Sequence, residues 1–345
     1  MNLFETIQLS VVSSSILAFL ISAIGCISFI KFYSSFKNKT KNQKRLNSLN
    51  IIPLGGVSMA FSFFLSVRFL GEASSKFAFI SFFALSIAFV GVIDDFLNLN
   101  WKTKILFQFL FVGIPVLNLN IFINIENILQ INLDNNLNFF FTICWVILLM
   151  NSVNFTDNMD GFAALNTAFI ALGLGIISFI FKQNYLADIS LILFFAIIGF
   201  FIFNYPPAKI YMGDSGSLFI GYVLGFISIL FDWNPLNQGS IYDSFAPVLL
   251  FFTIPLLDFT TVFTHRLKNN ISPTTGGTDH ISHRLLKSGL SVKRVLFVFF
   301  SINCIVFAML SASIFFNDLT IYLISIYILF IAFMFIKFYK MEVLD

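Results

Sequence analysis

The feature that most limits what this chain can fold into is a succession of long, uninterrupted apolar segments. A helix needs about 20 apolar residues to cross the roughly 30 Å hydrocarbon layer of a bilayer. The segments show no alternation with a period of two, which predicts helices rather than the strands of a β-barrel. Eleven spans are expected, at residues 9–30, 51–70, 77–93, 105–119, 137–153, 162–181, 189–203, 218–230, 245–263, 295–316 and 319–336. The expected fold is therefore an all-α polytopic integral membrane protein with about 11 transmembrane helices.

The composition supports this class. Of the 345 residues, 58% are hydrophobic and 11% are charged, whereas about a quarter of the residues of a soluble domain are charged. These values exclude a soluble globular protein and a disordered one. The 20 basic and 17 acidic residues nearly balance, so nothing indicates a nucleic-acid partner.

The distribution of lysine and arginine predicts the orientation. Residues 31–45 hold six basic residues and no acidic one, so this connection should face the cytoplasm. If the spans then alternate, every lysine and arginine except Arg68, Lys76 and Lys182 falls on the cytoplasmic side. The N-terminus is therefore expected outside and the C-terminus in the cytoplasm.

The inner connections carry polar residues of a kind that the outer ones lack. Five aspartates lie in three of them, and all three histidines lie in a fourth: Asp94, Asp95, Asp157, Asp160, Asp214, His265, His280 and His283. Ionisable groups close to the bilayer are candidates for function. We therefore expect one polytopic domain, residues 1–345, whose active site is built from the cytoplasmic loops 31–50, 94–104, 151–161, 204–217 and 264–294.

The residue types indicate the chemistry. Carboxylates with an amide oxygen nearby, and no cysteine, form an oxygen-donor set that suits Mg²⁺ or Mn²⁺. Lys104, Lys209 and Arg284 can hold phosphate oxygens, and the turn at 212–217 presents backbone N–H groups to an anion. The sequence thus predicts metal-assisted phosphoryl chemistry at the cytoplasmic surface.

Other interpretations account for some of these residues one at a time. An isolated Asp94-Asp95 pair is most often a solvated helix end, and a lone histidine in a basic loop usually stays hydrated. A lipid or solute transporter is the main alternative class, and it would place charges near the middle of the membrane. Asp258 is the only acidic residue well inside an expected span. A non-catalytic scaffold would not need five aspartates that face one way.

Together, the motifs resemble the polyprenyl-phosphate N-acetylhexosamine-1-phosphate transferases, also called glycosyltransferase family 4. The resemblance extends over residues 53–285 and is closest to bacterial undecaprenyl-phosphate GlcNAc-1-phosphate transferases. It implies a reaction in which a sugar-1-phosphate passes from a UDP-sugar to undecaprenyl phosphate and UMP is released. It also implies a multi-pass protein of the bacterial inner membrane, in contact with membrane lipid. A homodimer is kept as a candidate assembly.

The resemblance implies roles for individual residues. Asp94 and Asp95 match the family's paired aspartates beside the acceptor phosphate and the metal. Lys104 is expected on phosphate, in a Lys-x-x-x-Gln pattern that ends at Gln108. Asn154 and Asp214 match the positions that coordinate magnesium. The positions that line the nucleotide and nucleoside site are matched by Asp157, Asp160, Gly161, Asn204 and Tyr211.

The segment 276–285 resembles the family's histidine-rich loop, with His280 and His283 as catalytic residues. If a helix begins here, capped by Thr278 or Asp279, then His280, His283 and Arg284 share one face and would meet the donor diphosphate. Ser282 stands where GlcNAc-type enzymes usually have a further histidine. The peptidoglycan translocase carries three successive histidines, so the lipopolysaccharide or exopolysaccharide branch is favoured, with the phospho-MurNAc-pentapeptide translocase as the alternative.

Overall fold

The computed structural model describes residues 9–39, 51–70, 75–123, 135–232, 250–273, 275–316 and 320–343. These residues form helices joined by turns, and none of them lies in a strand. The helices are α1 (Leu9–Lys39), α2 (Gly55–Arg68), α3 (Ser75–Leu97), α4 (Trp101–Leu119), α6 (Asn135–Thr156), α7 (Phe162–Ile180), α8 (Asn184–Asn204), α9 (Gly213–Leu230), α11 (Thr253–Lys268), α12 (Ile281–Lys287), α13 (Val292–Phe315) and α14 (Thr320–Lys340). The predicted all-α fold is confirmed.

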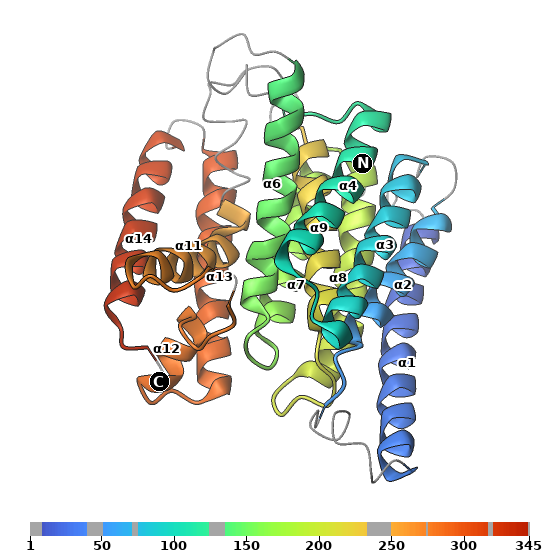
Figure 1. The fold of residues 1–345 in the computed structure, drawn as a ribbon. Coiled ribbons are helices and arrows are strands. Elements are labelled where there is room, and N and C mark those ends of the chain that lie inside the picture. Colours follow the sequence, from blue (N-terminus) through green and yellow to red (C-terminus); the bar gives the residue numbers. More distant parts are fainter. Residues whose placement is uncertain are drawn as a thin grey trace.

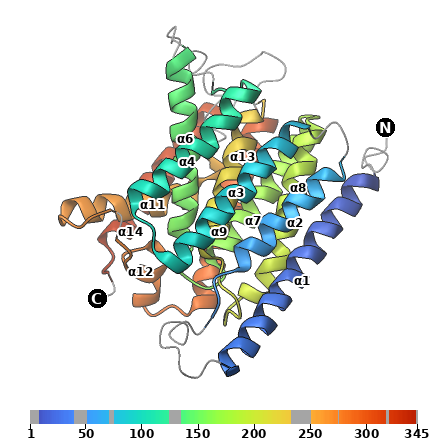
Figure 2. The ribbon, with the colours of Figure 1, turned by 45° about the vertical axis from the view of Figure 1, so that its right-hand side comes forward.

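Nine helices in the described part of the chain are long and apolar enough to span a membrane. The two other expected spans correspond to α2, with 14 residues, and α11, with 16 residues. Both ribbon views draw α11 across the bundle rather than along it (Figures 1 and 2). Its last turn holds His265, Arg266 and Lys268, which shortens its apolar stretch. The polytopic architecture is therefore confirmed, but the count of eleven is not.

Helix α9 occupies the centre of the bundle and is the most buried of these nine helices. It packs against α6, α3 and α2. A Cβ atom at Gly221 would lie 2.5 Å from the Cα atom of Met150 in α6, so only glycine permits this approach. Small residues at such contacts let helix backbones come close in a membrane protein. The close packing fixes the position of the N-terminal end of α9.

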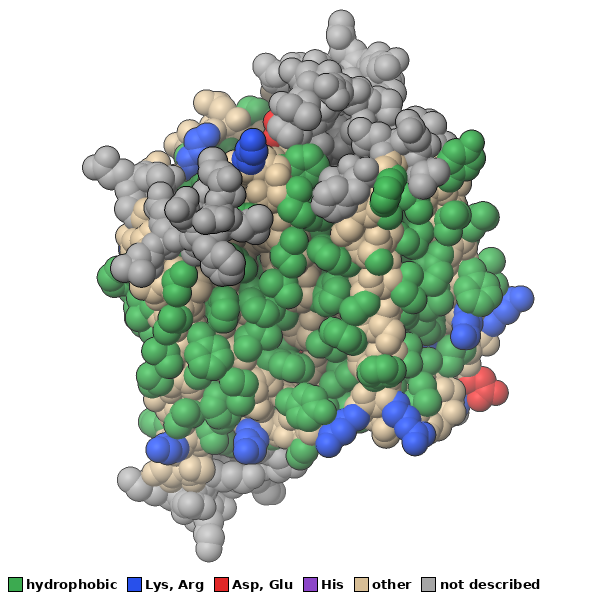
Figure 3. Space-filling view, turned by 180° about the vertical axis from the view of Figure 1, so that it is seen from behind, with side chains coloured by type: hydrophobic (Ala, Val, Ile, Leu, Met, Phe, Trp, Pro, Cys, Tyr) green, Lys and Arg blue, Asp and Glu red, His purple; other side chains and the backbone are tan. Residues whose placement is uncertain are grey.

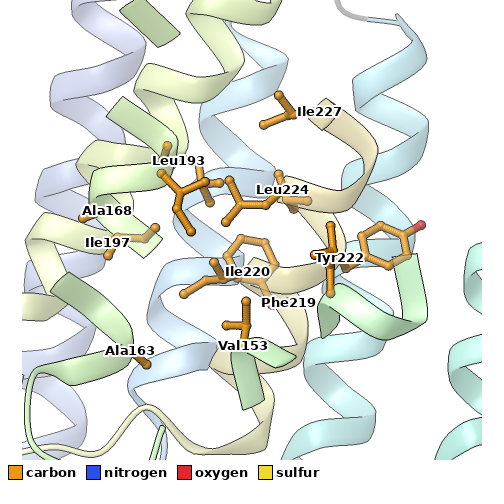
Figure 4. Close-up of a cluster of buried hydrophobic side chains, with 14 of the residues drawn as sticks. Val153, Ala163, Ala168, Leu193, Ile197, Phe219, Ile220, Tyr222, Leu224 and Ile227 are labelled. Carbon is orange, nitrogen blue, oxygen red and sulfur yellow. The ribbon is translucent and has the colours of Figure 1, made fainter. Parts of the chain in front are cut away.

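Apolar side chains fill the space around α9. The close-up in Figure 4 shows Val153 of α6, Leu193 and Ile197 of α8, and Phe219 and Ile220 of α9 in one buried cluster. Each of these five side chains is fully removed from solvent. The core therefore lies between α6, α8 and α9, whose ends carry the predicted site residues Asn154, Asn204 and Asp214.

The outer surface is apolar as well. Exposed side chains of α1 and α14, such as Ile24, Leu329 and Phe333, point away from the bundle. One face of the molecule shows a broad hydrophobic band, with lysine and arginine side chains along its lower edge (Figure 3). Such a band suits the hydrocarbon layer, and the charged edge suits lipid headgroups.

Several helices extend further than their apolar segments do. Helix α3 continues to Leu97, so Asp94 and Asp95 lie in its last turns rather than in a loop. Helix α6 includes Asn154, and α9 begins at Gly213. The predicted loops were therefore too long, because polar residues at these ends still continue the helical backbone. These ends meet at the lower end of the bundle in Figure 1.

Two other expected connections are only partly described. Helix α1 runs to Lys39, so the first part of the predicted loop 31–50 is helical. Residues 40–50 lie outside the described residues, as do 124–134 and 233–249. The orientation of the chain in the membrane stays a prediction.

Candidate functional site

Lys104 lies between two carboxylates that come from different helices. Its Nζ atom, in the first turn of α4, is 2.8 Å from Oδ2 of Asp94 in α3. The same Nζ atom pairs with Oδ2 of Asp214 in α9. The other oxygen of Asp94 accepts a 2.7 Å hydrogen bond from the backbone N–H of Leu99. The structure thus joins three predicted site residues through one ammonium group.

Asp95 binds the N-terminal end of α9. Its two oxygens accept from the backbone N–H groups of Asp214, at 2.9 Å, and Ser215, at 3.4 Å. A carboxylate at this position satisfies N–H groups that have no partner within the helix. Gly213 has φ of +69°, and a Cβ atom there would lie 2.5 Å from Oδ2 of Asp95. The turn predicted to hold an external anion therefore binds a carboxylate of the chain itself.

Asn154 holds the other oxygen of Asp214. Its Nδ2 atom donates to Oδ1 of Asp214 at 2.7 Å and to Oγ of Ser217 at 2.8 Å. The amide oxygen of Asn154 accepts no hydrogen bond from the described residues and can accept or coordinate. The two predicted metal ligands are thus neighbours, and Ser217, one turn after Asp214, is a partner that the sequence analysis missed.

Asp157 lies next to Asp214 and the start of α9. Its carboxylate accepts from the backbone N–H of Gly213. Burial, followed by the negative charge of Asp214, raises the pKa of Asp157 to about 7. The predicted nucleotide-site residue Asp157 is therefore close to the metal-site aspartate.

The remaining residues of the predicted nucleotide site hold two loops together. Oδ2 of Asp160 accepts from the backbone N–H of Ala208 at 2.9 Å. Oδ1 of Asn204 accepts from the N–H of Gly161 at 3.0 Å, and its Nδ2 donates to the carbonyl oxygen of Ile210 at 2.9 Å. Asn204 is 3% exposed, so its side chain serves the backbone here and not an open surface.

Tyr211 and Lys209 are more accessible. The backbone of Tyr211 bonds to Ile52 and Gly55, which anchors the segment before α2 to the segment before α9. Tyr211 is 42% exposed, and Lys209 is also exposed. Both side chains are therefore accessible to a ligand.

His280 and Asp258 form the centre of the histidine loop. Nδ1 of His280 is 2.9 Å from Oδ2 of Asp258 in α11. Oδ1 of Asp258 accepts from the N–H of Ile281, the first residue of α12, at 2.9 Å. The predicted caps Thr278 and Asp279 do not cap α12, because Asp258 supplies this bond and Asp279 binds Arg266 instead.

Asp279 and Arg266 form a bidentate pair. The two bonds are 2.8 Å and 2.7 Å long, and both residues are buried. Burial alone would raise the pKa of Asp279, but the hydrogen bonds and charge of Arg266 hold it below its ordinary value. This pair ties the histidine loop to the end of α11.

Arg284 differs most from its expectation. It is 1% exposed, and its Nη1 atom donates to the carbonyl oxygens of Phe338, at 3.2 Å, and Met341, at 2.7 Å. These carbonyls lie at the C-terminal end of α14, where a cation is favourable. The guanidinium therefore binds the end of α14, a contact that the sequence did not predict.

His283 stays beside His280. The centroids of the two rings are 6.2 Å apart, and His283 is partly exposed. Burial, with a smaller contribution from His280, lowers the pKa of His283. The two imidazoles are thus neighbours.

The oxygen donors fit a divalent cation of the magnesium type. Among the described residues, no three His, Cys, Asp or Glu side chains form a preformed metal cluster. However, Asp94 and Asp214 already hold one cation between them, the ammonium group of Lys104. Two carboxylates and the free oxygen of Asn154 are ligands that Mg²⁺ accepts, with water and phosphate completing its shell.

Comparisons with known proteins place the chain in a family. The sequence model described as glycosyl transferase family 4 matches residues 77–232, which include the carboxylate cluster but not the histidine loop. A phospho-N-acetylmuramoyl-pentapeptide-transferase of Streptococcus agalactiae serotype Ia is 30% identical over 259 residues, covering 67% of this chain and 76% of that protein. A probable undecaprenyl-phosphate N-acetylglucosaminyl 1-phosphate transferase of Bacillus subtilis is 28% identical over 257 residues, covering 74% of this chain and 69% of that protein.

These similarities and the helical bundle define the class as a multi-pass membrane transferase. The chain belongs to glycosyl transferase family 4, as the motifs predicted. Relatives of both names match at similar identity, so the expected preference for the GlcNAc-type branch is not confirmed.

Proposed function

We propose that this protein transfers an N-acetylhexosamine-1-phosphate, such as GlcNAc-1-phosphate, from a UDP-sugar to undecaprenyl phosphate. An oxygen of the acceptor phosphate would attack the phosphorus that carries the sugar. The bond from that phosphorus to the bridging oxygen would break, and UMP would leave with that oxygen. The observation that carries the proposal is the meeting of Asp94, Lys104 and Asp214 from three helices at one end of the bundle.

The geometry supports a division of labour between the paired aspartates. Asp95 uses both oxygens on the backbone of α9, so it serves as support. Asp94 is bonded to Lys104, the predicted phosphate-binding residue, and is the better candidate for base or nucleophile. Lys104 would exchange a carboxylate for a phosphate oxygen when substrate binds. A trapped aspartyl phosphate would distinguish covalent catalysis from direct attack.

Asp214 and the amide oxygen of Asn154 would hold Mg²⁺, or Mn²⁺ in its place. The ion would supply positive charge where two polyanions must approach each other. Asp214 is suited to binding the ion because Asn154 fixes one of its carboxylate oxygens. The other oxygen faces Lys104 and can exchange that partner.

The donor nucleotide would lie over the two loops that Asn204 and Asp160 hold together. Tyr211 and Lys209 are exposed there, and Asp157 and Gly161 would shape the loop beneath. His280 and His283 would face the donor diphosphate from the neighbouring loop. This arrangement would keep the soluble donor on the cytoplasmic side and the lipid acceptor in the bilayer of the bacterial inner membrane.

The sugar that is transferred determines which glycan the protein would initiate. The segment 280–283 differs less from the GlcNAc-type pattern than from the three successive histidines of the peptidoglycan translocase. This favours a donor such as UDP-GlcNAc and the initiation of lipopolysaccharide O-antigen or exopolysaccharide. The relatives that are named phospho-N-acetylmuramoyl-pentapeptide-transferases favour UDP-MurNAc-pentapeptide as the second candidate.

A panel of radiolabelled donors tests the proposal. Purified protein in detergent is incubated with undecaprenyl phosphate, Mg²⁺ and UDP-GlcNAc, UDP-GalNAc or UDP-MurNAc-pentapeptide. We expect labelled lipid from UDP-GlcNAc, and only when both substrates are present. Labelled lipid from UDP-MurNAc-pentapeptide alone would select the second candidate. No lipid product from any donor would contradict the transferase reaction.

A further inference from the structure

Asp258 is a fully buried carboxylate in α11 for which the reaction described above has no role. It is 0% exposed and accepts from three donors: Nδ1 of His280 at 2.9 Å, the N–H of Ile281 at 2.9 Å and Nδ2 of Asn158 at 3.4 Å. A buried carboxylate is costly unless such donors surround it. These hydrogen bonds therefore restrict the orientation of the groups that donate to Asp258.

The constraint on His280 is specific. An ionised carboxylate only accepts, so Nδ1 of His280 must carry the hydrogen in this bond. Nε2 then keeps its lone pair when the ring is neutral. Nε2 makes no hydrogen bond with the described residues and is not among their fully buried unpartnered atoms. It is thus the nitrogen that can meet a ligand.

Neighbouring side chains hold this pair in place. The ring of Phe155 packs edge-on against His280, with centroids 5.7 Å apart. Ser282 donates to the amide oxygen of Asn158, whose Nδ2 reaches Asp258. Phe155 and Asn158 flank Asp157, so the network connects the histidine loop to the end of α6 and the loop that follows it.

We propose that Asp258 is a positioning residue for His280. It fixes the tautomer and direction of the imidazole so that Nε2 is presented to the donor diphosphate, in the way that a buried aspartate orients a catalytic histidine elsewhere. This inference rests on the proposed transferase reaction, because it is through His280 that Asp258 acts.

A double-mutant cycle tests this role in the full-length protein. Asp258→Asn preserves shape but offers an N–H₂ group to Nδ1, which favours the opposite tautomer. We expect the maximal rate to fall by about 10²- to 10⁴-fold, with a smaller change in the KM for the donor. In a His280→Ala background, Asp258→Asn should change the remaining rate by less than about threefold. Asp188→Asn, the same chemical change in α8, is the matched control.

An equal loss from Asp258→Asn in both backgrounds would reduce Asp258 to a structural residue and overturn the proposal. A near-wild-type rate for His280→Ala or for Asp258→Asn would overturn it as well. A wild-type protein that transfers nothing would instead contradict the proposed function.

A spectroscopic measurement keeps the inference testable if Asp258→Asn does not fold. Nitrogen-15 NMR of the histidine side chains in the wild-type protein, with His280 assigned through His280→Gln, reports the tautomer without any turnover. We expect Nδ1 of His280 to be protonated, whether the ring is neutral or charged. A neutral ring protonated at Nε2 would overturn the proposal.

Discussion

Asp95 of α3 accepts a 2.9 Å hydrogen bond from the backbone N–H of Asp214, the second residue of α9. One carboxylate thus anchors the helix end that carries another. The two adjacent aspartates thus have different partners: Asp94 faces Lys104, while Asp95 holds the neighbouring helix.

The first prediction concerns this anchor. Asp95→Ala leaves two N–H groups of α9 without their acceptor, so we expect a loss of roughly 0.5–2 kcal/mol of stability, the usual range for a lost helix cap. Asp95→Asn keeps one accepting oxygen and should be affected less. The apparent midpoint of thermal unfolding in detergent measures both. Equal midpoints for Asp95→Ala and wild type would refute the anchoring role.

The second prediction concerns the ammonium group between Asp94 and Asp214. Lys104→Met removes a cation that a metal must displace, so the affinity for Mn²⁺ should rise at least roughly tenfold. Turnover should fall, because the phosphate loses its lysine. Electron paramagnetic resonance of free Mn²⁺ measures the affinity, with Lys102→Met, an exposed lysine of the same helix, as control. Weaker Mn²⁺ binding by Lys104→Met would show that Lys104 does not compete with the metal.

The third prediction concerns the proposed metal ligands. Asp214→Asn removes a formal negative charge from the site and should abolish turnover while the protein stays in the membrane. Asn154→Ala should raise the Mg²⁺ concentration needed for half-maximal rate, and added Mg²⁺ should restore part of the rate. A titration of rate against Mg²⁺ measures this. An Asp214→Asn variant that is fully active in excess EDTA would exclude the site.

The fourth prediction separates two roles of Arg284. The sequence suggested contact with the donor, whereas the structure shows bonds to the end of α14. Arg284→Ala should therefore destabilise the protein by about 2 kcal/mol or more, because several charge-assisted hydrogen bonds are lost. The KM for the donor should stay close to that of wild type in the protein that remains folded.

Lys287→Ala provides the control for Arg284. Lys287 is exposed and lies one turn further along α12, where it makes a long ion pair of 3.7 Å with Glu342 and donates to the carbonyl oxygen of Val343. We expect little change in its unfolding midpoint. An Arg284→Ala protein with an unchanged midpoint and a raised KM would favour the donor contact after all.

The parts of the site that could be predicted from the sequence are those that follow an apolar segment. Asp94, Asn154 and Asp214 each stand at the end of such a segment, so alternating spans bring them to the same end of the bundle. Their residue types then indicate a cation and phosphate. The structure confirms this proximity through the bonds of Lys104 and Asn154.

The parts that could not be predicted depend on contacts between distant segments. Nothing in the spacing of Arg284 indicates that it binds α14, since its partners are backbone carbonyls more than fifty positions away. The role of Asp258 likewise needs the position of His280, although an acidic residue within an apolar stretch was a visible signal. Helix ends were misjudged because polar residues can continue a helix that hydropathy would end.

The most direct test of the whole account is the synthesis of lipid-linked sugar by purified protein, with UMP release measured in the same reaction. We expect wild-type protein to form equal amounts of UMP and lipid product from UDP-GlcNAc and undecaprenyl phosphate, and Asp214→Asn to form neither. UMP release without undecaprenyl phosphate, or the same product yield from Asp214→Asn, would contradict the assignment of this carboxylate cluster as the transfer site.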